Sequence, residues 1–230
     1  MSLILPQRGR IRQAAAGGGA LSVSYLGQDN YSGTSETSHT ISAASLGADD
    51  ANRKILVSFA GNNSSASAAI TDVTVDGVSG SAIAGTSLHT DLATVNHYVS
   101  MWEVDYPSGT SKDIVITFSD VGFYRGGFVW YRIVNGTAVD GGGANVFGDP
   151  SISLDIATDD IAICHAYMYT NTSGSFSAPA SGWTVDLNNQ VFATQFAHEA
   201  AQTSTTGTPT TITFDVPIGT RTGLTGCVYR

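Results

Sequence analysis

The stretch PSGTSKDIVITFSDVGFYRGGFVWYRIV, residues 107–134, decides the fold, because its pattern returns at the end of the chain as TTGTPTTITFDVPIGTRTGLTGCVYR, residues 205–230. In the first copy a Ser-Gly-Thr turn leads into a strand with apolar residues at 114, 116 and 118 on one face. In the second copy a Thr-Gly-Thr turn leads into the same alternation at 212, 214 and 216. The triplet Trp-Tyr-Arg near the end of the first copy is echoed by Val-Tyr-Arg at the end of the second. The stretch therefore predicts a duplicated unit of β-structure.

Other blocks of the chain support this duplication. The run from Asn52 to Ser58 resembles residues 159–164, and Val73–Asp76 resembles Trp183–Asp186. The spacing between blocks drifts by several residues, as expected when loops change length and strands do not. We expect the unit to fill about residues 21–137 and to recur in about residues 150–230.

The composition predicts an all-β protein. Only 13% of the residues are charged and 26 are glycine, and short alternating runs rich in Thr, Val and Ile recur along the 230 residues. Two half-units of this kind form either two small sandwiches or one two-sheet antiparallel sandwich to which both halves contribute. We favour a single domain over residues 21–230, jelly-roll-like or immunoglobulin-like, because each half has few large apolar residues for a core of its own.

The charge excludes several partners. A formal net charge of −9 argues against nucleic acid and anionic membranes, which require a basic surface. No run of residues reaches the roughly 20 apolar positions of a membrane span. The opening MSLIL is broken at Pro6 and followed by arginines, so it does not resemble a secretory signal. We expect synthesis and folding in the cytoplasm.

Residues 1–20 differ from the rest of the chain and are expected to form an extended basic arm. Arg8, Arg10 and Arg12 are three of the ten basic residues, and Gly17-Gly18-Gly19 separates them from the first strand. The arm is either a disordered tail or a segment that docks onto an acidic surface, including that of a neighbouring copy.

The sequence contains no catalytic motif, and we expect no enzymatic activity and no cofactor. Glu103 and Glu199 fall in corresponding regions of the two halves, but Glu103 is expected on the outward side of its strand, so a paired-carboxylate site is disfavoured. His165 is expected on a core-facing row, and the histidines lack the spacing of metal ligands. Both cysteines, Cys164 and Cys227, fall in apolar strand patterns and are expected to be buried thiols.

Two aspartate pairs precede corresponding strands and offer oxygen ligands for calcium. They are Asp49-Asp50 and Asp159-Asp160. Neither loop has the ligand spacing of a known calcium motif, and aspartates are ordinary turn residues, so we predict no metal site.

Three aromatic residues are candidates for an interface or for stacking on sugars: Trp102, Trp130 and Tyr131. The strand that contains the last two is apolar on both faces, which favours a buried strand or a subunit interface over an open glycan site.

Several runs resemble a loosely defined group of virion-associated β-sandwich proteins of tailed bacteriophages and prophages. The runs are SLGADDANRKILVSF, VTVDGV and VDYPSGTSKDIVITFS, and the matching residues are Leu46, Gly47, Asp50, Arg53, Val73, Thr74, Gly77, Pro107, Gly109, Thr110 and Ile114 to Phe118. The resemblance covers most of residues 21–230 and leaves the arm out. Because the shared motifs are structural, it implies a fold and a virion setting more directly than a role.

This resemblance implies a non-enzymatic structural protein of the virion, accessory to the tail or baseplate or decorating the capsid. Its partners would be other phage structural proteins and copies of itself, with the arm as anchor. The alternative is a carbohydrate- or receptor-binding module of a tail fibre or spike, which would bind a host-surface glycan through exposed aromatic side chains.

Overall fold

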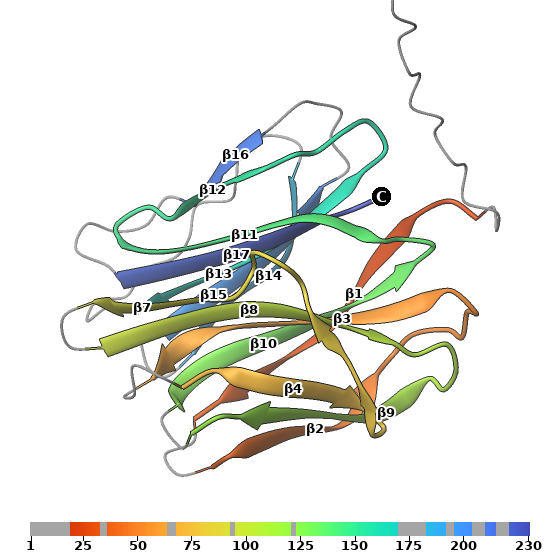
Figure 1. Cartoon of the computed structure of the whole chain (residues 1–230), viewed down its shortest axis with the longest axis horizontal. Coiled ribbons are helices and arrows are strands. Elements are labelled where there is room, and N and C mark those ends of the chain that lie inside the picture. The colour runs from red at the N-terminus through yellow and green to blue at the C-terminus, as the bar shows by residue number, and fades with distance from the viewer. Residues whose placement is uncertain are drawn as a thin grey trace, which may run out of the picture.

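The strands expected from the sequence form four stacked layers of antiparallel sheet (Figure 1). The computed structural model describes residues 19–32, 36–63, 68–92, 95–120, 123–169, 183–191, 196–203, 210–214 and 221–230. Every regular element within these ranges is a β-strand. The prediction of an all-β antiparallel sandwich is therefore confirmed, but the sheets number four over the described residues where two were expected, because each half builds two sheets around a core of its own.

The first half of the chain builds one two-sheet sandwich. Its large sheet has the order β1 (Ser22–Tyr31), β10 (Phe123–Val134), β3 (Arg53–Asn63), β8 (Val95–Asp105) and β6 (Ser81–Ala82), and β7 (Leu88–Leu92) also pairs with β8. Its small sheet has the order β2 (Ser38–Ser45), β9 (Ser111–Phe118), β4 (Ile70–Val75) and β5 (Val78–Ser79). The central place of β3 agrees with its two apolar faces.

The second half builds another sandwich with fewer described strands. Its large sheet has the order β11 (Ala138–Phe147), β17 (Arg221–Tyr229), β13 (Ile161–Tyr169), β15 (Phe196–Thr203) and β14 (Trp183–Val191). Its small sheet pairs β12 (Ser151–Leu154) with β16 (Thr210–Thr213). Residues 135–137 connect β10 to β11 and thereby join the two sandwiches.

The order of strand pairing repeats between the halves. The run β1-β10-β3-β8 corresponds to β11-β17-β13-β15, and the pair β2-β9 corresponds to β12-β16. The register repeats as well: Tyr131 lies opposite Leu56, and Tyr229 lies opposite Ile161. Aligning the two tyrosines thus aligns their neighbours, so the echo of Trp-Tyr-Arg in Val-Tyr-Arg marks equivalent ends of equivalent strands.

One predicted equivalence is wrong. Trp183–Asp186 lies in β14, which pairs with β15 in a large sheet, whereas Val73–Asp76 belongs mainly to β4, which pairs with β9 in a small sheet. By position β14 corresponds instead to β6 and β7, which pair with successive parts of the β8 edge that β3 leaves open. A short Thr/Val pattern fixes which residues alternate, but it does not specify the sheet that a strand joins.

The two large sheets pack face to face, and we call the interface between them the seam. Strand β3 lies against β13, β8 against β17, β10 against β15 and β7 against β11. Since β10 corresponds to β17 and β8 to β15, the β8–β17 and β10–β15 contacts are reciprocal, and the β3–β13 contact joins two equivalent strands. This is the pattern of a two-fold dimer interface, formed here within one chain.

Apolar clusters fill the three spaces between the four layers. The first core lies between the sheets of the first half and includes Ile55, Phe59, Ile114, Phe118 and Phe128. The second core lies between the sheets of the second half and includes Ile152, Cys164, Ile212, Phe214 and Leu224. The seam cluster comprises Leu56, Ile83, Met101, Val129, Tyr131, Ile133, Ile163, Ala200, Cys227 and Tyr229.

Candidate functional site

Two equivalent tyrosines cross the seam and hydrogen-bond carboxylates of the opposite half. Tyr131 of the first half donates its hydroxyl to Asp186 Oδ2 of the second at 3.0 Å. Tyr229 of the second half donates to Glu103 Oε2 of the first at 3.2 Å. Burial is the largest cause that raises the pKa of both phenols well above the ordinary value, so both hydroxyls remain donors at neutral pH.

The carboxylate of Asp186 is partly buried at a bulge in β14. Gln202 Nε2 donates to its Oδ1 at 3.0 Å, while Tyr131 occupies the other oxygen. Burial raises the pKa of Asp186, and the two hydrogen bonds oppose that rise. The ring of Tyr25 packs edge-on against Tyr131 and covers the cluster from β1.

Glu103 faces the seam, so its expected place on an outward surface is wrong. The face of the large sheet that points away from the first core is not a molecular surface, because the large sheet of the second half covers it. Lys54 Nζ donates to Glu103 Oε1 at 2.9 Å and Tyr229 binds the other oxygen. The side chain of Glu199, proposed as its partner in a paired-carboxylate site, lies outside the described side chains.

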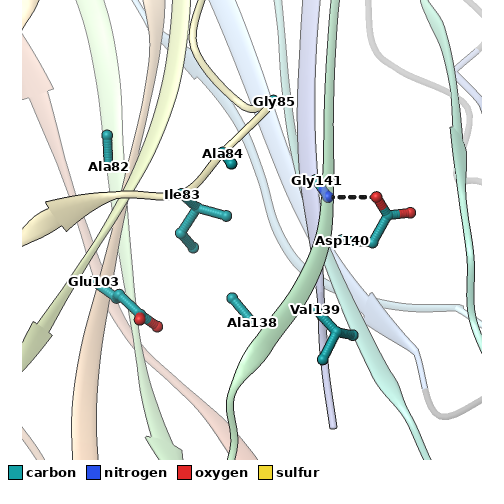
Figure 2. A pocket seen from close by; sticks show the side chains of 9 residues that line it. All are labelled: Ala82, Ile83, Ala84, Gly85, Glu103, Ala138, Val139, Asp140 and Gly141. Carbon is teal, nitrogen blue, oxygen red and sulfur yellow. Dashed lines mark hydrogen bonds between the residues drawn. The ribbon is translucent and has the colours of Figure 1, made fainter.

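A pocket of about 480 Å³ opens beside Glu103, between the segment 82–85 and the start of β11 (Figure 2). The carboxylate of Glu103 points across the pocket toward Ala138. The carboxylate of Asp140 lies on the other side of the β11 ribbon, where it accepts hydrogen bonds from the backbone amides of Gly141 and Asp155. Apart from the two acidic residues Glu103 and Asp140, the residues that line the pocket are small or apolar.

The seam also buries polar side chains away from this pocket. Ser58 Oγ and His165 Nδ1 lie 3.0 Å apart, with both residues fully buried. His165 therefore occupies the core-facing row that alternation predicted, and the core it faces is the seam. A serine and histidine sealed from solvent do not form a nucleophile that a substrate can reach.

The tryptophans named as interface or glycan candidates lie in the first core. Trp102 donates its indole N–H to Ser100 Oγ at 2.9 Å, and Trp130 donates to the Ser45 carbonyl at 2.9 Å. Both are buried, and Tyr131 is fully buried in the seam. Their ring faces pack on protein, so they do not provide a platform for a sugar. Arg8, Arg10 and Arg12 lie outside the described residues.

Both aspartate pairs have roles within loops. Asp50 accepts a hydrogen bond from the Asn52 amide, and Asp160 holds Arg230 through two hydrogen bonds of 2.9 and 2.6 Å. Over the described ranges, no group of three His, Cys, Asp or Glu side chains is placed to hold a metal ion. Cys164 and Cys227 are buried free thiols, and burial is the main cause that raises the pKa of each.

Sequence reasoning missed the role of Arg53, which organises two loops. Its guanidinium is buried and donates to five backbone carbonyls, those of Leu46, Gly47, Ala48, Tyr106 and Gly109, at 2.6 to 3.3 Å. The available signal was an arginine at the start of a strand with two apolar faces, since a buried charge at such a position requires partners.

Comparison of the chain with models of known protein families, with curated proteins and with solved structures found no match. The part of the chain that the structure describes contains no helix long and apolar enough to cross a membrane.

Proposed function

We propose that the chain is a non-enzymatic structural protein of a tailed-bacteriophage virion, accessory to the tail or baseplate or decorating the capsid. The observation that supports the proposal most is that two of the runs that resemble the phage group lie in contact in the fold. The run LGADDANR supplies Arg53 and three of its carbonyl acceptors, and the run YPSG supplies the other two. Two motifs distant in sequence thus form one structural unit.

The chemistry of the described side chains supports a structural role. The carboxylate of Glu103 is engaged by an ammonium and a phenol, and that of Asp186 by a phenol and an amide. The Ser58 and His165 pair is sealed within the seam. Side chains that satisfy one another across a buried interface stabilise a rigid body, which is the requirement on a subunit of a particle.

The glycan-binding alternative has no comparable support. Trp102 and Trp130 belong to the first core, and Trp183 packs partly buried against the second. No specific observation favours a sugar platform over the described strands.

The experiment is to purify particles of the phage or induced prophage that encodes the chain and to identify their proteins by mass spectrometry. We expect the chain to sediment with intact particles at a fixed ratio to the major capsid protein. Deletion of residues 1–19 should leave the strand spectrum in circular dichroism unchanged and remove the chain from the particles. Absence of the full-length chain from purified particles would contradict the proposal.

A further inference from the structure

The pocket beside Glu103 has two walls. On one side lie Ile83 and the Glu103 carboxylate, and Ala138 faces them from the start of β11 (Figure 2). Val139, the extra residue of a bulge in β11, lies on the far side of that strand and is 46% exposed. A flexible cationic side chain suits such a pocket, because its methylene stem packs on apolar surface while its head meets a carboxylate.

The surroundings of the pocket are acidic. Lys54, which pairs with Glu103 at 2.9 Å, also lies 3.8 Å from the largely exposed Asp105. On the other side of β11, the Asp140 carboxylate accepts a hydrogen bond from the Asp155 backbone amide. Arg230 is the nearby cation on that side, and it is held by Asp160. Carboxylates outnumber cations around the pocket, which attracts a basic segment.

The described chain begins close to this pocket. Asn135 Nδ2 donates to the Ala20 carbonyl at 3.3 Å, and the side chain of Leu21 packs against Gly136. Ala138, in the pocket wall, follows two residues later. From Gly19 to Arg12 is seven residues, a reach of up to about 23 Å for extended chain. Arg8 and Arg10 lie only a few residues further along.

We propose that the basic segment Arg8–Arg12 docks in the pocket of its own chain, with an arginine guanidinium joining Lys54 and Tyr229 on the Glu103 carboxylate and the apolar side chain of Ile11 against Ile83 and Ala138. Docking within the same chain is favoured over docking on a neighbour because a short tether gives a high effective concentration. The three consecutive glycines before Ala20 allow the chain to turn back. The inference is independent of the virion assignment, since it concerns the isolated chain.

The test uses the full-length chain with a nitroxide spin label at Gln7→Cys. The native thiols Cys164 and Cys227 are buried and are expected to remain unlabelled. In the two-dimensional ¹⁵N amide spectrum at low salt, we expect selective broadening of residues 82–85 and 138–141. Replacement of all three arginines by glutamine, or Glu103→Gln, should abolish that broadening. The matched control Glu36→Gln removes the same charge from an exposed site and should leave the broadening intact.

Three results would overturn the proposal. The first is a lack of selective broadening at the two pocket segments. The second is broadening that persists after the arginines are replaced. The third is broadening in a mixture of two chains, one that carries the nitroxide without ¹⁵N and one that carries ¹⁵N without the nitroxide. That result would assign the contact to a neighbouring copy.

Discussion

The two sandwiches share a strand order but close their loops by different means. In the first, the buried guanidinium of Arg53 gathers five carbonyls from two loops. In the second, Arg230 is about half exposed and pairs with the buried Asp160. The same strand order and register are therefore compatible with different loop interactions. The fold depends on the alternation of apolar residues more than on the hydrogen bonds of either arginine.

The cores differ at equivalent positions too. Phe59 lies opposite Phe128 in the first half, with ring centroids 4.8 Å apart, whereas Cys164 lies opposite Gly226 in the second. A Cβ built at Gly226 would lie 2.7 Å from Cys164 Sγ, so the second core is closed around the missing side chain. The same strand register therefore accommodates a pair of large aromatic residues in one half and a pair of small residues in the other. The small sheet that faces each pair packs against side chains of different size.

The largest effect is expected from Arg53→Met. Removal of the guanidinium takes a donor from five carbonyls of two loops, of which the Ala48 carbonyl keeps a second donor in Arg132 Nε, and we expect a loss of about 3–5 kcal/mol in the free energy of unfolding. Arg230→Met removes a half-exposed partner and should cost less. Urea unfolding of both variants measures the difference, and equal losses would show that the two loop devices are equally important.

A smaller difference is expected between the cores. Phe59→Ala should lower the free energy of unfolding by about 3–5 kcal/mol, because it creates a cavity beside Phe128. Cys164→Ala at the equivalent position removes one atom and should cost about 1 kcal/mol. Chemical denaturation checks both values. A larger loss for Cys164→Ala would mean that the second core, not the first, dominates stability.

The two reciprocal hydrogen bonds across the seam should respond alike. Tyr131→Phe and Tyr229→Phe each delete one hydrogen bond to a carboxylate and should each cost about 1–2 kcal/mol. In a double-mutant cycle, Glu103→Gln should couple to Tyr229→Phe and not to Tyr131→Phe. Coupling of Glu103→Gln to Tyr131→Phe would contradict the pairing of Glu103 with Tyr229 across the seam.

The smallest effect is the pH dependence of two aspartates in the second half, which should have opposite signs. Burial raises the pKa of Asp186 in the folded protein, so its contribution is fully present below its unfolded pKa and is lost as the pH rises through the folded value. The hydrogen bonds from Arg230 are the largest cause that lowers the pKa of Asp160, so its contribution is present above its unfolded pKa and is lost as the pH falls.

Unfolding midpoints measured from pH 7 down to pH 3 test this contrast. As the pH falls, the unfolding midpoint of Asp186→Asn should decrease relative to that of the unmodified chain. The midpoint of Asp160→Asn should increase relative to that of the unmodified chain. Parallel profiles for the two variants would show that their carboxylates have similar environments.

Alternation in the sequence predicted much of the fold. Ile114, Ile116 and Phe118 share the face that alternation assigned to them, and all three are buried. The central place of β3 followed from its two apolar faces, and the echo of Tyr131 in Tyr229 marked equivalent strands. These features depend on local periodicity, which a single sequence contains.

The seam could not be predicted from the sequence, because periodicity indicates which residues share a face of a sheet but not which sheet covers that face. Glu103 was therefore expected on the outside, and Asp186, at a bulge in β14, was not singled out. Trp102 and Trp130 remained candidates for an exposed surface because their partners, Ser100 and the Ser45 carbonyl, depend on strand pairing and loop position.

The central claim is that the two halves form a two-fold-like pair across the seam, and methyl nuclear Overhauser effects test it most directly. Leu56 and Met101 of the first half share the seam cluster with Ile163 of the second. We predict cross-peaks between the methyl groups of these first-half residues and those of Ile163 in the full-length chain. Cross-peaks from Leu56 and Met101 that are confined to first-half residues would contradict the account.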